Sequence, residues 1–229
     1  MLTFDHALAD LVLRLHAAGV VKIDTEKGFK LKLHETKPDA PPSPIFLNIR
    51  TPSNPKPGPL ADELVDLIGA LLWRHAKEKL IAFDAVAGLP NAGIPLAEAF
   101  AKAAQKDEWT ISIIKLGKVE IGAGMRKVEG VIDTGGVSPG KTVLLIDDLI
   151  TEGHTKQEGI DALRVKGYTV LDTLVVVDRQ QGGTEYLKQK KIQLWYLLTL
   201  PKIVIFLAKE GKITQQEQFL VLQYLGAQV

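Results

Sequence analysis

The densest group of polar residues in the chain directly follows a short apolar run, Val143 to Ile146. It consists of Asp147, Asp148, Thr151, Glu152, Gly153, His154 and Thr155. Two adjacent carboxylates suit the hydroxyls of a ribose diol or the water shell of a Mg²⁺ ion. Threonine hydroxyls and the free N–H groups of the next predicted helix suit a phosphate. These residue types in this order predict a site for a sugar with a phosphate at one end and a metal-bound anion at the other.

Two more polar clusters follow predicted strands. One is Gly88 to Gly93, after the apolar run 82–87, and the other is Asp178 to Gly183, after the run 170–177. Ligands bind outside the carboxyl ends of the strands in an open parallel sheet. The three clusters are therefore expected at the ligand-binding edge of such a sheet.

The elements that position these clusters alternate between strands and helices. Helices are predicted around 8–15, with a stop at Gly19, and over 60–79, 94–104 and 156–166; strands are predicted over 29–33, 45–49, 82–87, 110–114, 143–146 and 170–177. Residues 117–140 are rich in glycine and charge and lack a period, so they are predicted to form a long loop. Alternation at this spacing indicates an α/β fold with a parallel sheet.

Composition narrows the class of protein. The 229 residues suit a single domain, and a net charge of +1 gives no reason to expect nucleic acid or an anionic membrane as partner. The absence of cysteine excludes disulfides and fits a reducing compartment. The most apolar stretch, Leu194 to Ala208, is interrupted by Pro201 and Lys202. It falls short of the roughly 20 residues that a bilayer requires, so no membrane span is expected.

A second glycine-rich stretch, Gly135 to Thr142, fits the P-loop pattern G-x-x-x-x-G-K-T. A P-loop needs a strand before it and a helix after it. Here a predicted strand follows at once and no helix does, so an ATPase site is rejected.

The first motif, TVLLIDDLITEGHT at 142–155, resembles the binding signature for 5-phosphoribosyl-1-pyrophosphate (PRPP) of type I phosphoribosyltransferases. Four other segments resemble the orotate phosphoribosyltransferase branch of that family. They are FKLK at 29–32, SPIF at 43–46, VAGLPNAGIPLA at 86–97 and VVVDRQQGG at 175–183. The resemblance extends over nearly the whole chain.

The resemblance implies a type I phosphoribosyltransferase-like fold, a parallel twisted sheet flanked by helices with a small N-terminal hood. The chain would form one domain, with a hood over about 1–58, a core over about 59–199 and C-terminal helices over about 200–229. It further implies a cytoplasmic homodimer that joins orotate to the ribose of PRPP, releasing pyrophosphate and giving orotidine 5′-monophosphate. No metal ligand is expected from the protein, because Mg²⁺ arrives with PRPP.

The resemblance also assigns residues to each substrate. PRPP would meet Asp147, Asp148, Thr151, Glu152, Gly153, His154, Thr155, Gly88, Leu89, Pro90, Asn91 and Lys115. Orotate would meet Lys32, Ile45, Phe46, Thr151 and Arg179, and the arginine fork suits its carboxylate. The catalytic groups would be Asp148, Lys118 and Lys115.

The sequence departs from the family in the mobile loop, where the family carries Arg-Lys-x-x-Lys. Lys115 and Lys118 keep the lysine spacing without the arginine, whereas Arg126-Lys127 keeps the dipeptide but has Gly130 in place of the last lysine. The first placement is favoured, because the loop should follow the strand that ends near Ile114. Glu152 in the phosphate loop is a second departure, since a carboxylate there must point away from the ligand. Two alternatives stay open: transfer to another base, and a regulator that binds PRPP or a nucleotide without chemistry.

Overall fold

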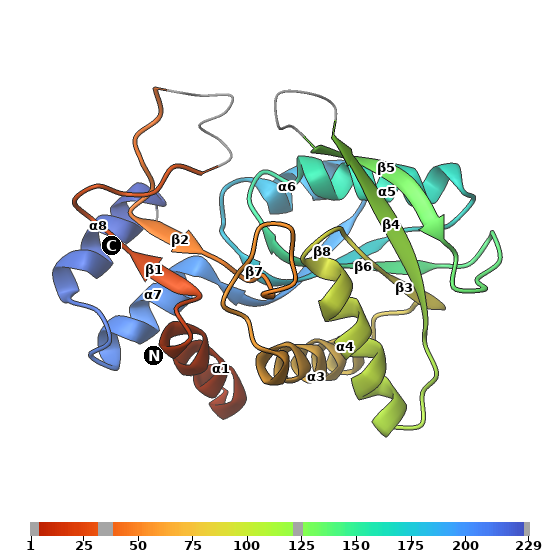
Figure 1. Ribbon diagram of the computed structural model, residues 1–229, viewed down its shortest axis with the longest axis horizontal. Coiled ribbons are helices and arrows are strands. Elements are labelled where there is room, and N and C mark those ends of the chain that lie inside the picture. The colour runs from red at the N-terminus through yellow and green to blue at the C-terminus, as the bar shows by residue number, and fades with distance from the viewer. Residues whose placement is uncertain (1–4, 32–38, 121–125, 227–229) are drawn as a thin grey trace.

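A six-stranded sheet forms the centre of the computed structural model, which describes residues 5–31, 39–120 and 126–226 (Figure 1). The strands lie in the order β5 (Arg126–Asp133), β4 (Ser112–Glu120), β3 (Ala85–Gly88), β6 (Val143–Ile150), β7 (Asp172–Asp178) and β8 (Gln193–Thr199). Neighbours pair in parallel, except for β4 and β5, which are antiparallel. The predicted α/β fold with a parallel sheet is confirmed, with one antiparallel edge strand.

Helices cover both faces of this sheet (Figure 1). Helices α3 (Asp62–Glu78) and α4 (Gly93–Lys106) lie on one face, and α5 (His154–Val165) and α6 (Gly183–Gln189) lie on the other. Strand β6 shows why both faces of the sheet must be covered by helices. Leu144 and Ile146 pack into one hydrophobic cluster, whereas Val143 and Leu145 pack into the other. Successive side chains of a strand point to opposite faces, so a strand buried on both sides is a continuous apolar run.

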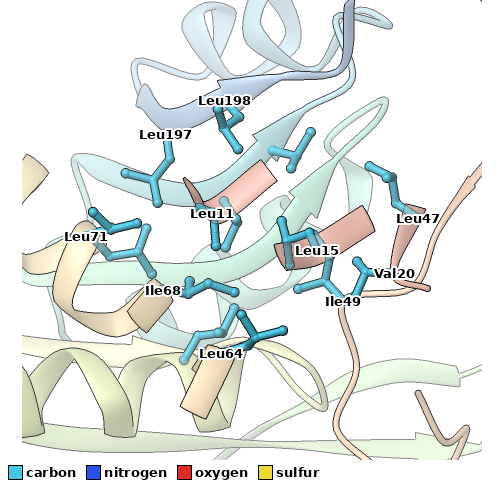
Figure 2. Packing of buried hydrophobic residues seen from close by; sticks show 14 of the residues in the cluster. Leu11, Leu15, Val20, Leu47, Ile49, Leu64, Ile68, Leu71, Leu197 and Leu198 are labelled. Atoms are coloured by element: carbon cyan, nitrogen blue, oxygen red, sulfur yellow. The ribbon is translucent and has the colours of Figure 1, made fainter. Parts of the chain in front are cut away.

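The N-terminal segment shares the first of these clusters with the sheet. Helix α1 (His6–Ala17) packs Leu11 and Leu15 near Ile68 of α3, and Figure 2 shows Val20 and Leu47 in the same cluster. Val20 precedes β1 (Val21–Ile23), which pairs antiparallel with β2 (Ile45–Leu47) to form the hood hairpin. Helices α7 (Leu200–Lys209) and α8 (Gln215–Tyr224) complete the chain. Within the described ranges, no helix has the length and apolar character needed to cross a membrane.

The predicted loop over 117–140 is wrong for 117–120 and 126–133, which are strands, and confirmed for 134–140; residues 121–125 lie outside the described ranges. Strand β4 continues to Glu120, and the chain returns as β5 to form an antiparallel hairpin. The hairpin has two register irregularities, and its buried positions include Leu116 and Val128. Glycine and charged residues between these apolar positions hid the period of an edge strand that is covered on one face only.

Smaller differences concern the hood and the ends of elements. In place of the predicted strand over 29–33, Phe29 forms an isolated bridge with Ser43, and residues 32–33 lie outside the described ranges. Strands β1 and β8 and helix α6 were not predicted. The other predicted strands and helices are present, with ends that shift by a few residues, as is usual for element boundaries.

Helices α3 and α4 approach closely at Gly69. A Cβ atom on this glycine would lie 2.4 Å from Cβ of Ala99 and 2.5 Å from its carbonyl carbon. We predict that Gly69→Ala destabilises the protein by about 1–3 kcal/mol, because overpacking outweighs the roughly 1 kcal/mol gained from replacing a helical glycine. Urea unfolding measures the difference.

The neighbouring exposed position provides the matched control. Ala70→Gly removes a methyl from the same turn of α3 at the surface, and it should cost about 1 kcal/mol through helix propensity alone. A Gly69→Ala variant that is more stable than the wild type would contradict this close packing.

Candidate active site

Three loops meet at the carboxyl ends of β3, β6 and β7. The N–H of Leu89 donates to the carbonyl of Ile146 at 2.9 Å, which holds the loop 88–93 against β6. The N–H of Arg179 donates to the carbonyl of Ile150 at 3.0 Å, which holds the loop 178–183 on the other side. The predicted convergence of the three polar clusters is confirmed.

Glycines allow these loops to approach β6 closely. A Cβ atom on Gly93 would lie 2.4 Å from the carbonyl oxygen of Ile146, and one on Gly183 would lie 2.5 Å from that of Thr151. Any larger residue would push a loop away from the strand. The glycines of the second and third clusters therefore set the width of the site.

The segment 151–155 has the geometry of a phosphate cradle. Gly153 adopts φ +92° and is the residue before α5, whose first N–H groups have no partner within the helix. Thr151 and Thr155 are half-buried. Glu152 is exposed, with its carboxylate 3.9 Å from Nε2 of His154, whose ring packs edge-on against Tyr186 at 4.9 Å. The predicted phosphate contacts of Glu152 and His154 stay predictions.

Asp147 is buried and forms an ion pair with a lysine that the sequence reasoning missed. Nζ of Lys156 lies 2.6 Å from Oδ2 of Asp147, and the two side chains are only 8% and 7% exposed. The same ammonium donates to the carbonyl of Leu149. A signal was present, because Lys156 shares the buried stripe of α5 with Ile160 and Leu163 at i+4 and i+7. A lysine in an apolar stripe indicates a buried partner.

Asp148 is half-buried beside this pair. Its Oδ1 accepts a hydrogen bond from the N–H of Leu149 at 2.7 Å. Burial and the charge of Asp147 raise the pKa of the Asp148 carboxyl to about 7, against the opposing charge of Lys156. A carboxyl with a strongly raised pKa at the ligand-binding edge of a parallel sheet is a candidate functional group.

Arg179 is buried, with only 3% of its surface exposed. Its Nε donates to Oε1 of Gln181 at 2.8 Å, whereas Nη2 is buried and has no hydrogen-bond partner in the described part of the chain. Burial lowers the pKa of the guanidinium, and Tyr224 of α8 opposes this shift. An unpaired buried donor is costly, and an anionic ligand would satisfy it.

Lys115 and Lys118 lie on strand β4, so the favoured placement in a loop after Ile114 is wrong. Nζ of Lys118 donates to the carbonyl of Pro90 at 2.5 Å, which brings this lysine to the loop 88–93. Lys115 pairs with Glu98 of α4 at 3.3 Å. The alternative dipeptide, 126–127, begins strand β5 and is also not in a loop.

The orotate side is only partly described. Lys32 lies outside the described residues. Ile45 is fully buried in the core, and its contact with orotate stays a prediction. Phe46 is half-buried, with its ring 5.7 Å from that of Phe29, and its contact with orotate stays a prediction.

The segment that fits the P-loop pattern, 135–142, lies at the opposite end of β6 from the loops 88–93, 151–155 and 178–183. Residues 135–142 lead directly into β6 at the amino end of the strand, and Lys141 pairs with Asp84 at 3.1 Å. The rejection of the P-loop is confirmed, because no helix follows. Across the described ranges, no group of three or more His, Asp or Glu side chains is placed to hold a metal ion.

Comparison with known proteins agrees with this arrangement. The model of the phosphoribosyl transferase domain matches residues 60–195. The chain is 30% identical to an orotate phosphoribosyltransferase of Saccharolobus solfataricus over 80% of this chain and 84% of that protein. It is 29% identical to uridine 5′-monophosphate synthase of Bos taurus over 76% of this chain, but the match spans only 33% of that longer protein.

A solved structure shows the same fold. The orotate phosphoribosyltransferase of Aeropyrum pernix superimposes with a TM-score of 0.65 at 25% identity, covering 89% of this chain and 99% of that one. The family model matches more than half of the chain, and the matched range includes all three loops, 88–93, 151–155 and 178–183. The chain therefore belongs to the phosphoribosyltransferase family, in its orotate phosphoribosyltransferase branch.

Proposed function

We propose that the protein transfers ribose 5-phosphate from PRPP to orotate, giving orotidine 5′-monophosphate and pyrophosphate. The observation that carries the proposal is the unpaired, buried Nη2 of Arg179 beside a phosphate cradle. A cation that lacks a protein partner suits the carboxylate of a flat, anionic base. The names of the relatives support orotate as this base.

PRPP fits the three loops by its chemistry. The 5′-phosphate lies on the turn 151–155, at the amino end of α5. The pyrophosphate lies along the loop 88–91, whose Pro90–Asn91 peptide bond is cis. The ribose hydroxyls face Asp147 and Asp148, of which Asp148 is the more accessible.

The reaction breaks the bond between ribose C1 and the pyrophosphate oxygen as C1 bonds to N1 of orotate. The transition state resembles an oxocarbenium ion, so catalysis depends on positioning and on neutralising charge on the departing pyrophosphate. Mg²⁺ enters as part of the substrate, bound to the pyrophosphate, and supplies positive charge there. Lys118 reaches the same loop through its hydrogen bond to the carbonyl of Pro90, and Lys115 lies opposite Gly88 in the register of β3 and β4.

A specific feature favours a second candidate, a regulator that binds PRPP without chemistry. Ile114 stands where the family pattern has an arginine, and Lys115 is already paired with Glu98. Loss of these charges from the pyrophosphate would lower turnover more than affinity. A cytoplasmic location and a homodimer remain predictions in either case.

The direct test mixes the protein with orotate, PRPP and Mg²⁺ and follows the absorbance of orotate. Consumption of orotate with release of pyrophosphate is the expected result. Calorimetry measures PRPP binding in parallel. Tight binding without turnover would support the regulator, and absence of both would overturn the proposal.

Replacing the buried guanidinium tests the orotate subsite. Arg179→Met should weaken orotate binding roughly 10- to 100-fold, because a hydrogen bond to a charged group is lost. The melting temperature should not fall, because the change removes a buried cation that lacks a full set of partners. Arg14→Met on the exposed face of α1 is the control. Equal orotate affinity in both variants would remove Arg179 from the subsite.

The carboxyl of Asp148 should make the unliganded protein less stable as pH rises. Its pKa is about 7 in the fold and near 3.8 in the unfolded chain, so the folded state holds the extra proton between these values. Stability is then lost as pH rises from about 4 to 7. Asp148→Asn should be more stable than wild type at pH 8 by on the order of 1 kcal/mol, and the difference should vanish near pH 4.

The same variant should bind PRPP about tenfold more weakly at pH 8, because the amide is a poorer acceptor for the ribose hydroxyls. Thermal unfolding and calorimetry measure the two effects. Asp10→Asn, at an exposed position of α1, should change neither. Unchanged PRPP affinity in Asp148→Asn would count against the ribose subsite.

A further inference from the structure

A buried cation lies directly behind the two carboxylates of the ribose subsite. Nζ of Lys156 contacts Oδ2 of Asp147 at 2.6 Å and also donates to the carbonyl of Leu149. These contacts bind α5 to the end of β6 on both sides of Asp148. Lys156 is only 6% exposed, so its ammonium is not accessible to a ligand that binds from solution.

The buried ion pair of Asp147 and Lys156 is costly in free energy if its only role is to stabilise the fold. Taking an ammonium and a carboxylate out of water costs several kcal/mol per ion, and apolar replacements of similar volume are often as stable or more so. Lys156 lies in line with Ile160 and Leu163, where a leucine would pack against the same cluster. The retained charge therefore points to a role in the site.

That role follows from the neighbouring charges. Asp147 and Asp148 are adjacent, and two close carboxylates cannot both stay ionised without a compensating charge. Lys156 contacts Asp147 at 2.6 Å, and its charge lowers the pKa of the neighbouring Asp148 carboxyl, against burial and the charge of Asp147, which raise it. It compensates the charge of Asp147 and so reduces the repulsion between the two carboxylates.

The two aspartates also differ in their surroundings and therefore in their roles. Oδ2 of Asp147 holds Lys156, and Oδ1 lies against Gly93, within 3.0 Å of the place where a Cβ of that glycine would be. Its side chain is 7% exposed, which leaves little surface for a sugar. Asp148 is half-buried and accepts a hydrogen bond from the N–H of Leu149 through Oδ1.

We propose that Lys156 is a positioning residue that holds and compensates the charge of Asp147, so that Asp148 is the carboxyl that accepts the hydroxyls of a ribose diol. This inference rests on the proposed function and deepens it. It assigns selectivity for ribose over 2-deoxyribose to a lysine that does not touch the sugar.

The test compares ribose 5-phosphate with 2-deoxyribose 5-phosphate as calorimetric probes, because they differ in one hydroxyl of the diol. The wild type should prefer the ribose form by about tenfold, the typical value of a hydrogen bond to a charged group. Lys156→Met should bring this preference to within about twofold of unity. Lys166→Met, exposed at the end of α5, should keep the wild-type preference.

The ratio of the affinities for ribose 5-phosphate and 2-deoxyribose 5-phosphate distinguishes a positioning role of Lys156 from a purely structural role. A structural lysine would change both affinities alike, so a weakened Lys156→Met variant that keeps the tenfold ratio overturns the proposal. Unchanged affinities for both sugars would overturn it as well. A wild type that binds neither sugar would overturn the proposed function itself, and this inference with it.

A double variant keeps the test decisive if Lys156→Met fails to fold. Asp147→Asn with Lys156→Met removes both buried charges and should fold, and Asp148 then lacks a charged neighbour that raises its pKa. The double variant should keep the ribose preference to within about threefold of wild type. Loss of the preference there would show that Asp147 or Lys156 acts on the sugar in another way, contrary to the proposal.

Discussion

Parallel pairing of β3, β6 and β7 is the constraint on which the site depends. Parallel strands release their following loops at the same edge, so segments far apart in sequence become neighbours without any contact between their side chains. Backbone hydrogen bonds from Leu89 and Arg179 to β6 then fix the two outer loops on the central one. The sheet and the glycines of the loops determine this arrangement, and the side chains are placed by it. The turn 151–155 and the buried Arg179 are therefore both held close to β6.

Charge is distributed unevenly within this arrangement. The buried ion pair of Asp147 and Lys156 is neutral as a unit, whereas Asp148 and Arg179 are left incompletely satisfied. A protein that needed only stability would not keep a carboxyl with a raised pKa and a guanidinium with an unpaired donor at one edge of its sheet. Both defects are of the kind that a ligand carrying hydroxyls and a carboxylate would relieve.

The sequence predicted the sheet, its helices and the three loops because each depends on local signals. Apolar runs mark strands that are buried on both faces, and the aspartates, threonines and glycines follow them directly. It did not predict the β4–β5 hairpin, because an edge strand with one covered face and interior glycines has a weak period. Partners across the fold were also hidden: nothing local connects Tyr224 with Arg179, or Lys118 with the carbonyl of Pro90.

Two glycine-containing segments of similar composition show how far a motif depends on its place in the fold. Residues 135–142 and 151–155 both offer glycine, hydroxyls and a nearby basic residue, and they lie at opposite ends of the same strand, β6. At the amino end no helix follows, and the lysine of the motif is occupied by Asp84. At the carboxyl end a helix begins at once, so its unpaired N–H groups face the edge where the other two loops gather. The direction of the strand therefore decides which of the two segments is followed by the amino end of a helix, and that segment is the one proposed to bind phosphate.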